Sequence, residues 1–230
     1  IHLISGIGGG FLLLLMGVSF KLLPMFLISS LCFPVLAWSS NLIWNMGVFL
    51  LIISFFPMVV FLQSWGLACL LLGLMLYLAE VICILLKKKR PLDAPMALFL
   101  FGIFMILPLL LLIIELMTQW PGWLPDSGDF GPRILILANA FSILSFTILG
   151  MAMKIIPFLV WQLRYAHKLG KESVPSTAKM TKARWNKFAN LLIILSTFFL
   201  IGAFLAVHPL FIRITTGGVI AGISMLSLNL

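Results

Sequence analysis

Charged residues are scarce in this chain, where Asp, Glu, Lys and Arg together make up 9% of 230 residues. A soluble domain usually carries about 25% charged residues. The shortage is greatest for acids, because six Asp and Glu stand against fifteen Lys and Arg. An ordinary soluble globular domain is therefore excluded. This composition instead requires an apolar solvent around the chain.

Cysteine is also scarce, with only Cys32, Cys69 and Cys83 in the whole chain. The three are far apart in the sequence and sit in or near apolar stretches. No CxxC or CxxCH spacing is present, so the pattern gives no indication of a metal site, a redox motif or covalently attached haem. We expect all three cysteines to be packing residues.

Apolar residues dominate, at 63% of the chain with a mean hydropathy of +1.23. A helix needs about 20 apolar residues to cross the hydrocarbon layer of a bilayer. Seven stretches qualify, roughly 2–23, 41–62, 64–86, 95–118, 133–161, 188–207 and 209–230. We therefore predict an all-α, polytopic transmembrane bundle in which residues 1–230 form a single domain. Residues 25–40 are too short and too broken by proline to cross, which predicts an interfacial or re-entrant segment.

The chain begins at Ile1 in what already reads as a span, without the Met and basic region that open a signal peptide. We therefore expect it to be a fragment of a longer chain.

The basic residues indicate how the spans are oriented. Thirteen of the fifteen Lys and Arg fall on one side of the predicted topology, and only Arg133 and Arg213 fall on the other. Because basic loops stay in the cytoplasm, this asymmetry predicts that loops 87–94 and 162–187 are cytoplasmic and that loop 119–132 is outside. The expected location is the cytoplasmic membrane of a prokaryote. The net charge of +9 is a topology signal and gives no reason to expect a nucleic-acid partner.

One pattern occurs twice. The string GVSFKLLPMF at 17–26 and the string GMAMKIIPFLVW at 150–161 share a Gly, three residues, a Lys, two aliphatic residues and a Pro. The copies end the first and the fifth predicted spans, whose starts are four spans apart, so both run in the same direction across the membrane. A period this long fits a block of spans, and we predict a parallel four-helix repeat.

Charged residues inside the spans are costly and therefore candidates for function. Lys21 and Lys154 occupy the matched position of the repeat, and Glu80 lies near the end of the third span. One interpretation is a proton or ion station entered from the cytoplasm. The other is a pair of lysines that snorkel from equivalent helix ends. We expect Glu80 to lie within salt-bridge or single-water reach of Lys154 or Lys21.

A second group of candidates lies at the predicted outer side. His2 is followed by a glycine-rich stretch in which Gly6 and Gly10 leave a flat helix face for a helix or a planar ligand. Neutral imidazole at such a place can ligate haem iron or copper, although a boundary histidine is also a common headgroup contact. His208 opens the last span on the same side, and Arg213 could pair with a propionate or an anionic lipid head.

The order of His2, the glycine-rich stretch, GVSFKLLPMF and, four spans later, KIIPFLVWQLRY resembles prokaryotic membrane proteins distantly similar to subunit I of haem-copper oxidases and nitric oxide reductases. This resemblance implies that the seven spans correspond to helices six to twelve of a twelve-helix subunit in three parallel four-helix arcs. It transfers His2 as the one candidate metal ligand. The fifth span lacks the expected haem histidine and the second lacks the expected copper histidines, which argues against an oxygen-reducing centre.

Three functions follow from these patterns. The first is a haem-copper-oxidase-like respiratory membrane protein that binds haem or senses a redox ligand, with turnover in doubt. The second is a transporter or channel that uses Lys21, Lys154 and Glu80. The third is an assembly subunit without a ligand. The expected partners are the lipid bilayer, other membrane subunits and, at residues 168–187, anionic lipid.

Overall fold

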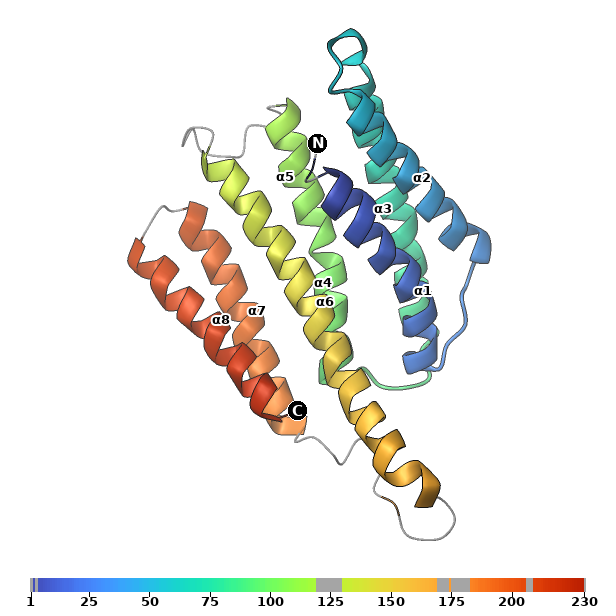
Figure 1. Ribbon diagram of the computed structural model, residues 1–230, viewed down its shortest axis with the longest axis vertical. Helices are drawn as coiled ribbons and strands as arrows, with labels where there is room; N and C mark the ends of the chain where they lie inside the picture. Colours follow the sequence, from blue (N-terminus) through green and yellow to red (C-terminus); the bar gives the residue numbers. More distant parts are fainter. Residues whose placement is uncertain are drawn as a thin grey trace. The chain divides into compact units, whose positions relative to one another are not determined.

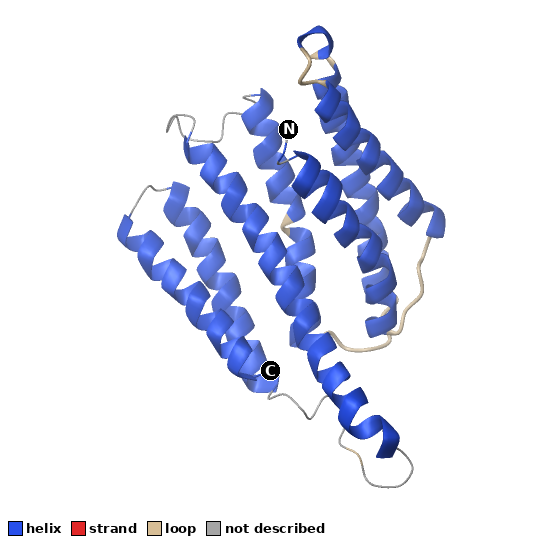
Figure 2. Ribbon diagram, viewed as in Figure 1, coloured by secondary structure: helices blue, strands red, loops and turns tan. Residues whose placement is uncertain are grey.

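The computed structural model describes residues 2, 4–118, 130–168, 174, 183–205 and 209–229. Every regular element among these residues is a helix, and none of them forms a strand (Figure 2). The all-α class predicted from the sequence is confirmed. The chain divides into two compact units, Ile1–Leu92 and Asp93–Leu230, and each is described by itself.

The first unit contains three long helical segments. In chain order its elements are the π-helix η1 (Ile4–Leu12), α1 (Leu13–Leu27), α2 (Pro34–Ile53), the short 3-10 helix η2 (Pro57–Val59) and α3 (Leu62–Leu86) (Figure 1). Pro34 favours a helix start because its fixed φ suits the first turn and its missing N–H is not needed there. Helix α2 therefore begins at Pro34 instead of residue 41. Of the expected re-entrant segment, only residues 28–33 lie between the helices.

Glycines bring α2 and α3 together as an antiparallel pair. A Cβ atom at Gly47 would lie 2.9 Å from the carbonyl oxygen of Gly66, and a Cβ atom at Gly73 would lie 2.9 Å from the backbone nitrogen of Trp44. Small residues allow helix backbones to approach this closely, which is how membrane helices commonly associate. The α2–α3 hairpin therefore depends on glycines, because a residue without a side chain lets the two backbones come this close.

Helix α1 is attached to α3 through Tyr77, which is fully buried. Its hydroxyl forms a 2.9 Å hydrogen bond with the Ser19 hydroxyl, and its ring meets the Phe20 ring edge-on with centroids 5.3 Å apart. A buried tyrosine needs such a partner for its hydroxyl. These contacts fix how α1 is rotated against α3.

The second unit begins with α4 (Ala94–Phe104) and α5 (Ile106–Thr118) and continues with α6 (Phe130–Tyr165), η3 (Ala166–Lys168), α7 (Ala183–Leu205) and α8 (Pro209–Asn229). The break at Met105 divides one apolar stretch into α4 and α5. Pro108 explains it, because proline has no N–H to donate to the carbonyl of Phe104 and its ring crowds that carbonyl.

In this second unit, two antiparallel helix pairs are also packed through glycine. In the pair of α4 and α6, a Cβ atom at Gly150 would lie 2.7 Å from the backbone nitrogen of Phe99. In the pair of α7 and α8, Gly218 faces Ser196 and Gly222 faces Ile193. A buried core joins the four helices α4, α6, α7 and α8, and consists of Leu98, Phe146, Met153, Ala189, Ile193 and Leu226.

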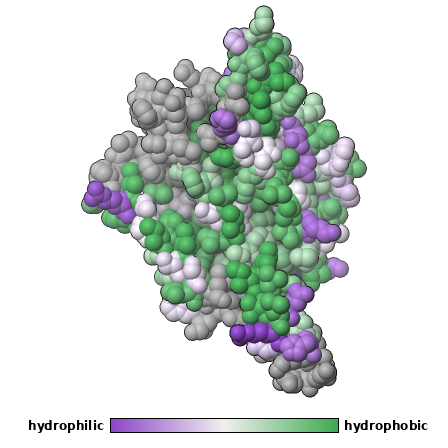
Figure 3. All heavy atoms as spheres, viewed as in Figure 1, coloured by the Kyte–Doolittle hydropathy of each residue, from purple (hydrophilic) through white to green (hydrophobic). Residues whose placement is uncertain are grey.

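Five segments of the described residues are long and apolar enough to cross a membrane: Ile4–Leu27, Pro34–Ile53, Leu62–Leu86, Ala94–Glu115 and Ala138–Tyr165. Large apolar side chains such as Phe49, Phe141 and Leu191 are exposed, and apolar surface prevails on the face seen in Figure 3. Such exposure suits lipid and not water. The prediction of a multi-pass helical membrane protein in contact with the bilayer is supported. Crossing by α7 and α8, and the parallel repeat, stay predictions.

Candidate functional site

The glycine-rich start of the chain forms a π-helix with two different faces. His2, Gly6 and Gly10 are all exposed. A Cβ atom at Gly6 would meet no atom within 4 Å, and one at Gly10 would meet only the carbonyl oxygen of Ser5 at 3.8 Å. The flat, open face expected at these two glycines is therefore present. π-Helical turns are rare and are often found at functional sites.

The opposite face of the same π-helix packs on α2. A Cβ atom at Gly9 would lie 3.3 Å from a methyl carbon of Val48, so this side is nearly full. The indole nitrogen of Trp44 donates a 2.9 Å hydrogen bond to the carbonyl oxygen of Gly8. The glycine cluster thus separates into residues that hold the π-helix on α2 and residues that leave its outer face bare.

The other proposed ligand contacts belong to the second part of the chain. His208 lies outside the described residues, and Arg213 is exposed on α8 in the second unit. No group of three or more His, Cys, Asp or Glu that could hold a metal ion occurs in the described parts of the chain. Among the described residues of the first unit, His2 is the only histidine.

Glu80 is fully buried on α3, but its carboxylate has no lysine partner among the described residues. Oε1 accepts hydrogen bonds from the backbone N–H groups of Cys32 at 2.7 Å and of Phe33 at 3.2 Å, and Oε2 lies 3.2 Å from the same Phe33 nitrogen. The direct partners of Glu80 are thus backbone donors from the α1–α2 loop and not a lysine, while single-water reach of Lys21 or Lys154 stays a prediction.

This contact makes Glu80 a cap for α2. The N-cap residue is Phe33, whose side chain has no oxygen to accept the first free N–H groups of the helix. A carboxylate from α3 takes that role, and its negative charge lies at the positive end of the α2 helix dipole. The Glu80 carboxylate and the N–H groups before α2, which are far apart in the sequence, thereby satisfy each other's hydrogen-bonding needs inside an apolar unit.

Lys154 forms an ion pair with Asp93, and both residues belong to the second unit. The lysine side chain is 14% exposed and the aspartate side chain 40% exposed, so the pair sits at the edge of the packed helices. Asp93 also caps α4, since Oδ1 accepts from the backbone nitrogen of Met96 at 3.3 Å. The Asp93 carboxylate thus caps α4 and pairs with the Lys154 ammonium group at the same time.

A buried amide adjoins this pair. Asn190 on α7 donates from Nδ2 to the carbonyl oxygen of Ala94 at 2.6 Å, while its Oδ1 is buried without a hydrogen-bond partner. Such orphaned acceptors are uncommon and call for an explanation. The start of α4 therefore carries a charge pair and a free acceptor.

The two lysines of the repeated pattern lie in different surroundings. Lys21 is exposed on α1, which ends three residues after Pro24, whereas Lys154 is mostly buried and paired. Helix α6 continues beyond Pro157 to Tyr165. Residues 119–129 of the expected outer loop fall outside the described residues, and residues 130–132 belong to α6. Most of the segment 168–187 also falls outside them, so its contact with anionic lipid stays a prediction.

Sequence reasoning missed Asp93, Cys32 and Cys83. Asp93 could have been found, because in an antiparallel hairpin the residue before the first helix lies near the end of the second, where Lys154 stands. The cysteines were expected to be packing residues, yet Cys32 and Cys83 form a disulfide with Cα atoms 6.2 Å apart, and only Cys69 is free. Their separation of 51 residues left no local spacing to recognise.

Comparison with protein-family models, with curated proteins and with solved structures finds no match to this chain. The functional argument therefore depends on the geometry of its own residues.

Proposed function

We propose that this chain is part of a haem-copper-oxidase-like membrane protein in which His2 binds haem against the face formed by Gly6 and Gly10. The observation that carries the proposal is the bare face of η1 at Gly6 and Gly10, two unobstructed glycines that follow the exposed His2 by four and eight residues. A porphyrin is planar and needs a helix face without side chains beside its axial ligand.

The residues present fit half of a haem site. His2 would supply an imidazole ligand to the iron, and Gly6 and Gly10 would leave room for the macrocycle beside the helix. Bound haem would supply one-electron chemistry or the binding of a small gas at iron. Any further protein ligand to the iron would come from residues other than those that the structure describes.

An optical spectrum of the full-length protein purified from its membrane tests the proposal. We expect a Soret band that shifts on reduction with dithionite and that falls at least tenfold in His2→Ala. His167→Ala is the matched control, because His167 is also exposed but lies in η3 near the far end of α6. That variant should keep the full band.

The glycine face can be tested separately. Gly6→Leu should lower haem occupancy, while Gly17→Leu, on the same helical segment and equally free of neighbours within 4 Å, should not. A wild-type protein without a Soret band, or a His2→Ala protein with an undiminished one, would refute haem binding at this face.

A second candidate function, ion transport, is favoured by the buried Oδ1 of Asn190 beside the pair of Lys154 and Asp93. A free acceptor next to a charge pair is suited to a proton or a small cation that moves along the start of α4. The pair lies in the second unit, so this function does not depend on His2.

Proteoliposomes loaded with a pH-sensitive dye test transport. With a potassium gradient and valinomycin we expect proton entry that Lys154→Ala reduces at least fivefold. Lys21→Ala, which removes the exposed lysine of the matched sequence position, should retain the flux. Equal fluxes in both variants and in protein-free liposomes would rule out this pathway.

A further inference from the structure

The loop between α1 and α2 is tied to α3 at two points. Cys32 forms the disulfide with Cys83, and the backbone N–H groups of Cys32 and Phe33 donate to Glu80, one turn before Cys83 on α3. Residues 28–33 therefore sit over a buried carboxylate and are held there by one covalent bond. We call residues 28–33 together with Glu80 and Cys83 the latch.

The latch holds its loop in an unfavourable state. Ile28 has φ 52° and ψ 54°, the left-handed conformation that a β-branched residue rarely adopts. The hydroxyl of Ser29 is buried without a hydrogen-bond partner. Both features cost free energy, and they persist only where surrounding bonds impose them. At Ile28 these bonds belong to the end of α1, where the backbone N–H groups of Ile28 and Ser29 donate to the carbonyl oxygen of Pro24. The disulfide and the Glu80 contacts hold the other end of the loop, at Cys32 and Phe33.

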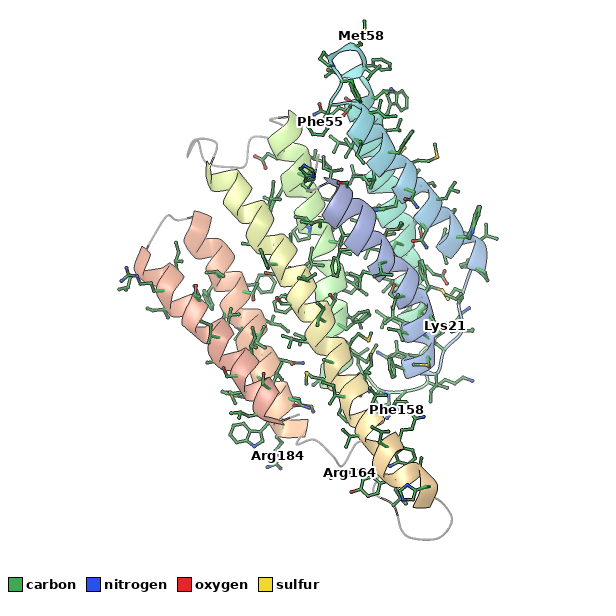
Figure 4. The ribbon with its side chains drawn as sticks, viewed as in Figure 1. Lys21, Phe55, Met58, Phe158, Arg164 and Arg184 are labelled. Carbon is green, nitrogen blue, oxygen red and sulfur yellow. A yellow bond between two sulfur atoms is a disulfide. The ribbon has the colours of Figure 1, made fainter. Side chains whose placement is uncertain are left out.

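The latch lies at the basic end of the first unit. The backbone N–H groups of Lys89 and Arg90 each donate to the carbonyl oxygen of Leu27 at 3.2 Å, which brings the end of α3 to the end of α1. All five Lys and Arg of residues 1–92 are at this end, namely Lys21, Lys87, Lys88, Lys89 and Arg90. The opposite tip is apolar, with Phe55 and Met58 exposed (Figure 4).

This charge distribution conflicts with a permanent disulfide. The end of a membrane helix that carries Lys and Arg faces the cytoplasm. In that compartment thiols are kept reduced, and disulfides that do form are usually transient, catalytic or redox-sensing. A structural staple would be expected at the apolar tip instead.

We propose that Cys32 and Cys83 form a reversible thiol–disulfide exchange site that opens and closes the latch over Glu80. Both cysteines are half-buried, so a reductant can reach them from the aqueous side. The partner is a dithiol, either a small molecule or a protein with two neighbouring thiols.

The exchange balances as a two-electron step. A thiolate of the dithiol attacks one sulfur of the Cys32–Cys83 bond, a mixed disulfide forms, and the other cysteine leaves as a thiolate that takes a proton from water. The second thiol of the partner then attacks the mixed disulfide and releases the remaining cysteine. The protein gains two thiols and the dithiol becomes a disulfide.

Reduction changes the surroundings of Glu80. Once the covalent tie is broken, the Cys32 end of the loop is held only by its hydrogen bonds to Glu80, and it can leave the carboxylate. The backbone donors of Cys32 and Phe33 move with it. The N-terminus of α2 and a buried acid thereby respond to the redox state at one end of the unit.

Thiol counting in membranes tests the exchange. Cells are quenched with acid and the protein is treated with a maleimide-polyethylene glycol, which adds one label to the oxidised chain through Cys69 and three to the reduced chain. We expect the three-label form in cells under reducing conditions and the one-label form after a mild oxidant. In vesicles of known sidedness, an impermeant phosphine should reduce the bond only from the cytoplasmic face.

Hydrogen exchange tests the opening. We expect the amides of residues 28–33 to exchange about tenfold faster in the wild-type protein treated with a dithiol, because local opening controls their rate. The Cys32→Ser/Cys83→Ser variant should match the reduced protein, and Cys69→Ser should behave as the oxidised wild type. Reduction of the wild-type chain serves even where the double variant does not fold.

Three results would overturn the proposal. The first is a bond that stays oxidised in cells and is reduced only from outside, which would make it an external staple. The second is three labels under every condition, which would return all the cysteines to a packing role. The third is unchanged hydrogen exchange of residues 28–33 after complete reduction.

Discussion

Gly150→Ala is expected to destabilise the second unit by about 3 kcal/mol, since extra atoms forced between packed elements usually cost about 1 to 3 kcal/mol and occasionally more. The new Cβ atom would lie 2.7 Å from the backbone nitrogen of Phe99 and 2.8 Å from the carbonyl oxygen of Pro95. Both are backbone atoms of α4, so a change of side-chain rotamer cannot relieve the clash. Helices α4 and α6 would have to separate.

The consequence extends to the charge pair at the same end of the hairpin. Lys154 follows Gly150 by one turn, and Asp93 precedes Pro95 by two residues, so a wider α4–α6 spacing also strains their contact. The free energy of unfolding, measured by denaturant titration in detergent micelles with circular dichroism, checks the prediction.

Gly202→Ala is the matched control. Gly202 is an exposed glycine of α7 whose added Cβ atom would meet no atom within 4 Å. Alanine is the better helix former by up to about 1 kcal/mol, so this variant should be as stable as the wild type or slightly more so. Equal losses in the two variants would show that α4 and α6 are not packed as described.

Glu80→Ala is expected to destabilise the first unit by about 3 kcal/mol. The change removes the acceptor for the backbone N–H groups of Cys32 and Phe33. These two groups, at the N-terminus of α2, are left without a hydrogen-bond acceptor. An unsatisfied buried donor costs about 1 to 3 kcal/mol. The negative charge at the α2 N-terminus is lost as well.

Glu80→Gln separates the hydrogen bonds from the charge. Glutamine keeps one side-chain oxygen, so it can still accept from Cys32 or Phe33, and the expected loss is about 1 kcal/mol. Both variants are measured with the Cys32–Cys83 bond intact, again by denaturant titration. If alanine is tolerated as well as glutamine, Glu80 does not cap α2.

Parts of the fold could be predicted because they depend on local composition. The long apolar runs predict the type of the helices and their approximate extent. The start of α2 was missed because residues 25–40 contain Pro34, which was interpreted as a barrier although at the first helical position it favours a start.

The candidate sites were harder to predict than the helices. Exposure of Gly6 and Gly10 agrees with the expected flat face, since it depends only on which side of one helical segment a residue lies. The partners of Glu80 and Lys154 did not follow from the sequence, because a long charged side chain inside an apolar unit bonds to whichever polar group the helix packing brings within reach. For Glu80 that partner is the N-terminus of α2, and for Lys154 it is Asp93, the cap of α4.

The amino-acid sequence alone determined that this protein is helical and apolar enough for the membrane, because a helix satisfies its own backbone and hydropathy is counted residue by residue. Only the tertiary structure decided which cysteines join, which carboxylate meets which donor and which glycines are crowded. Those outcomes depend on how far one helix slides and turns against another. A shift of a single residue rotates a helix by about 100°, which is enough to replace every partner.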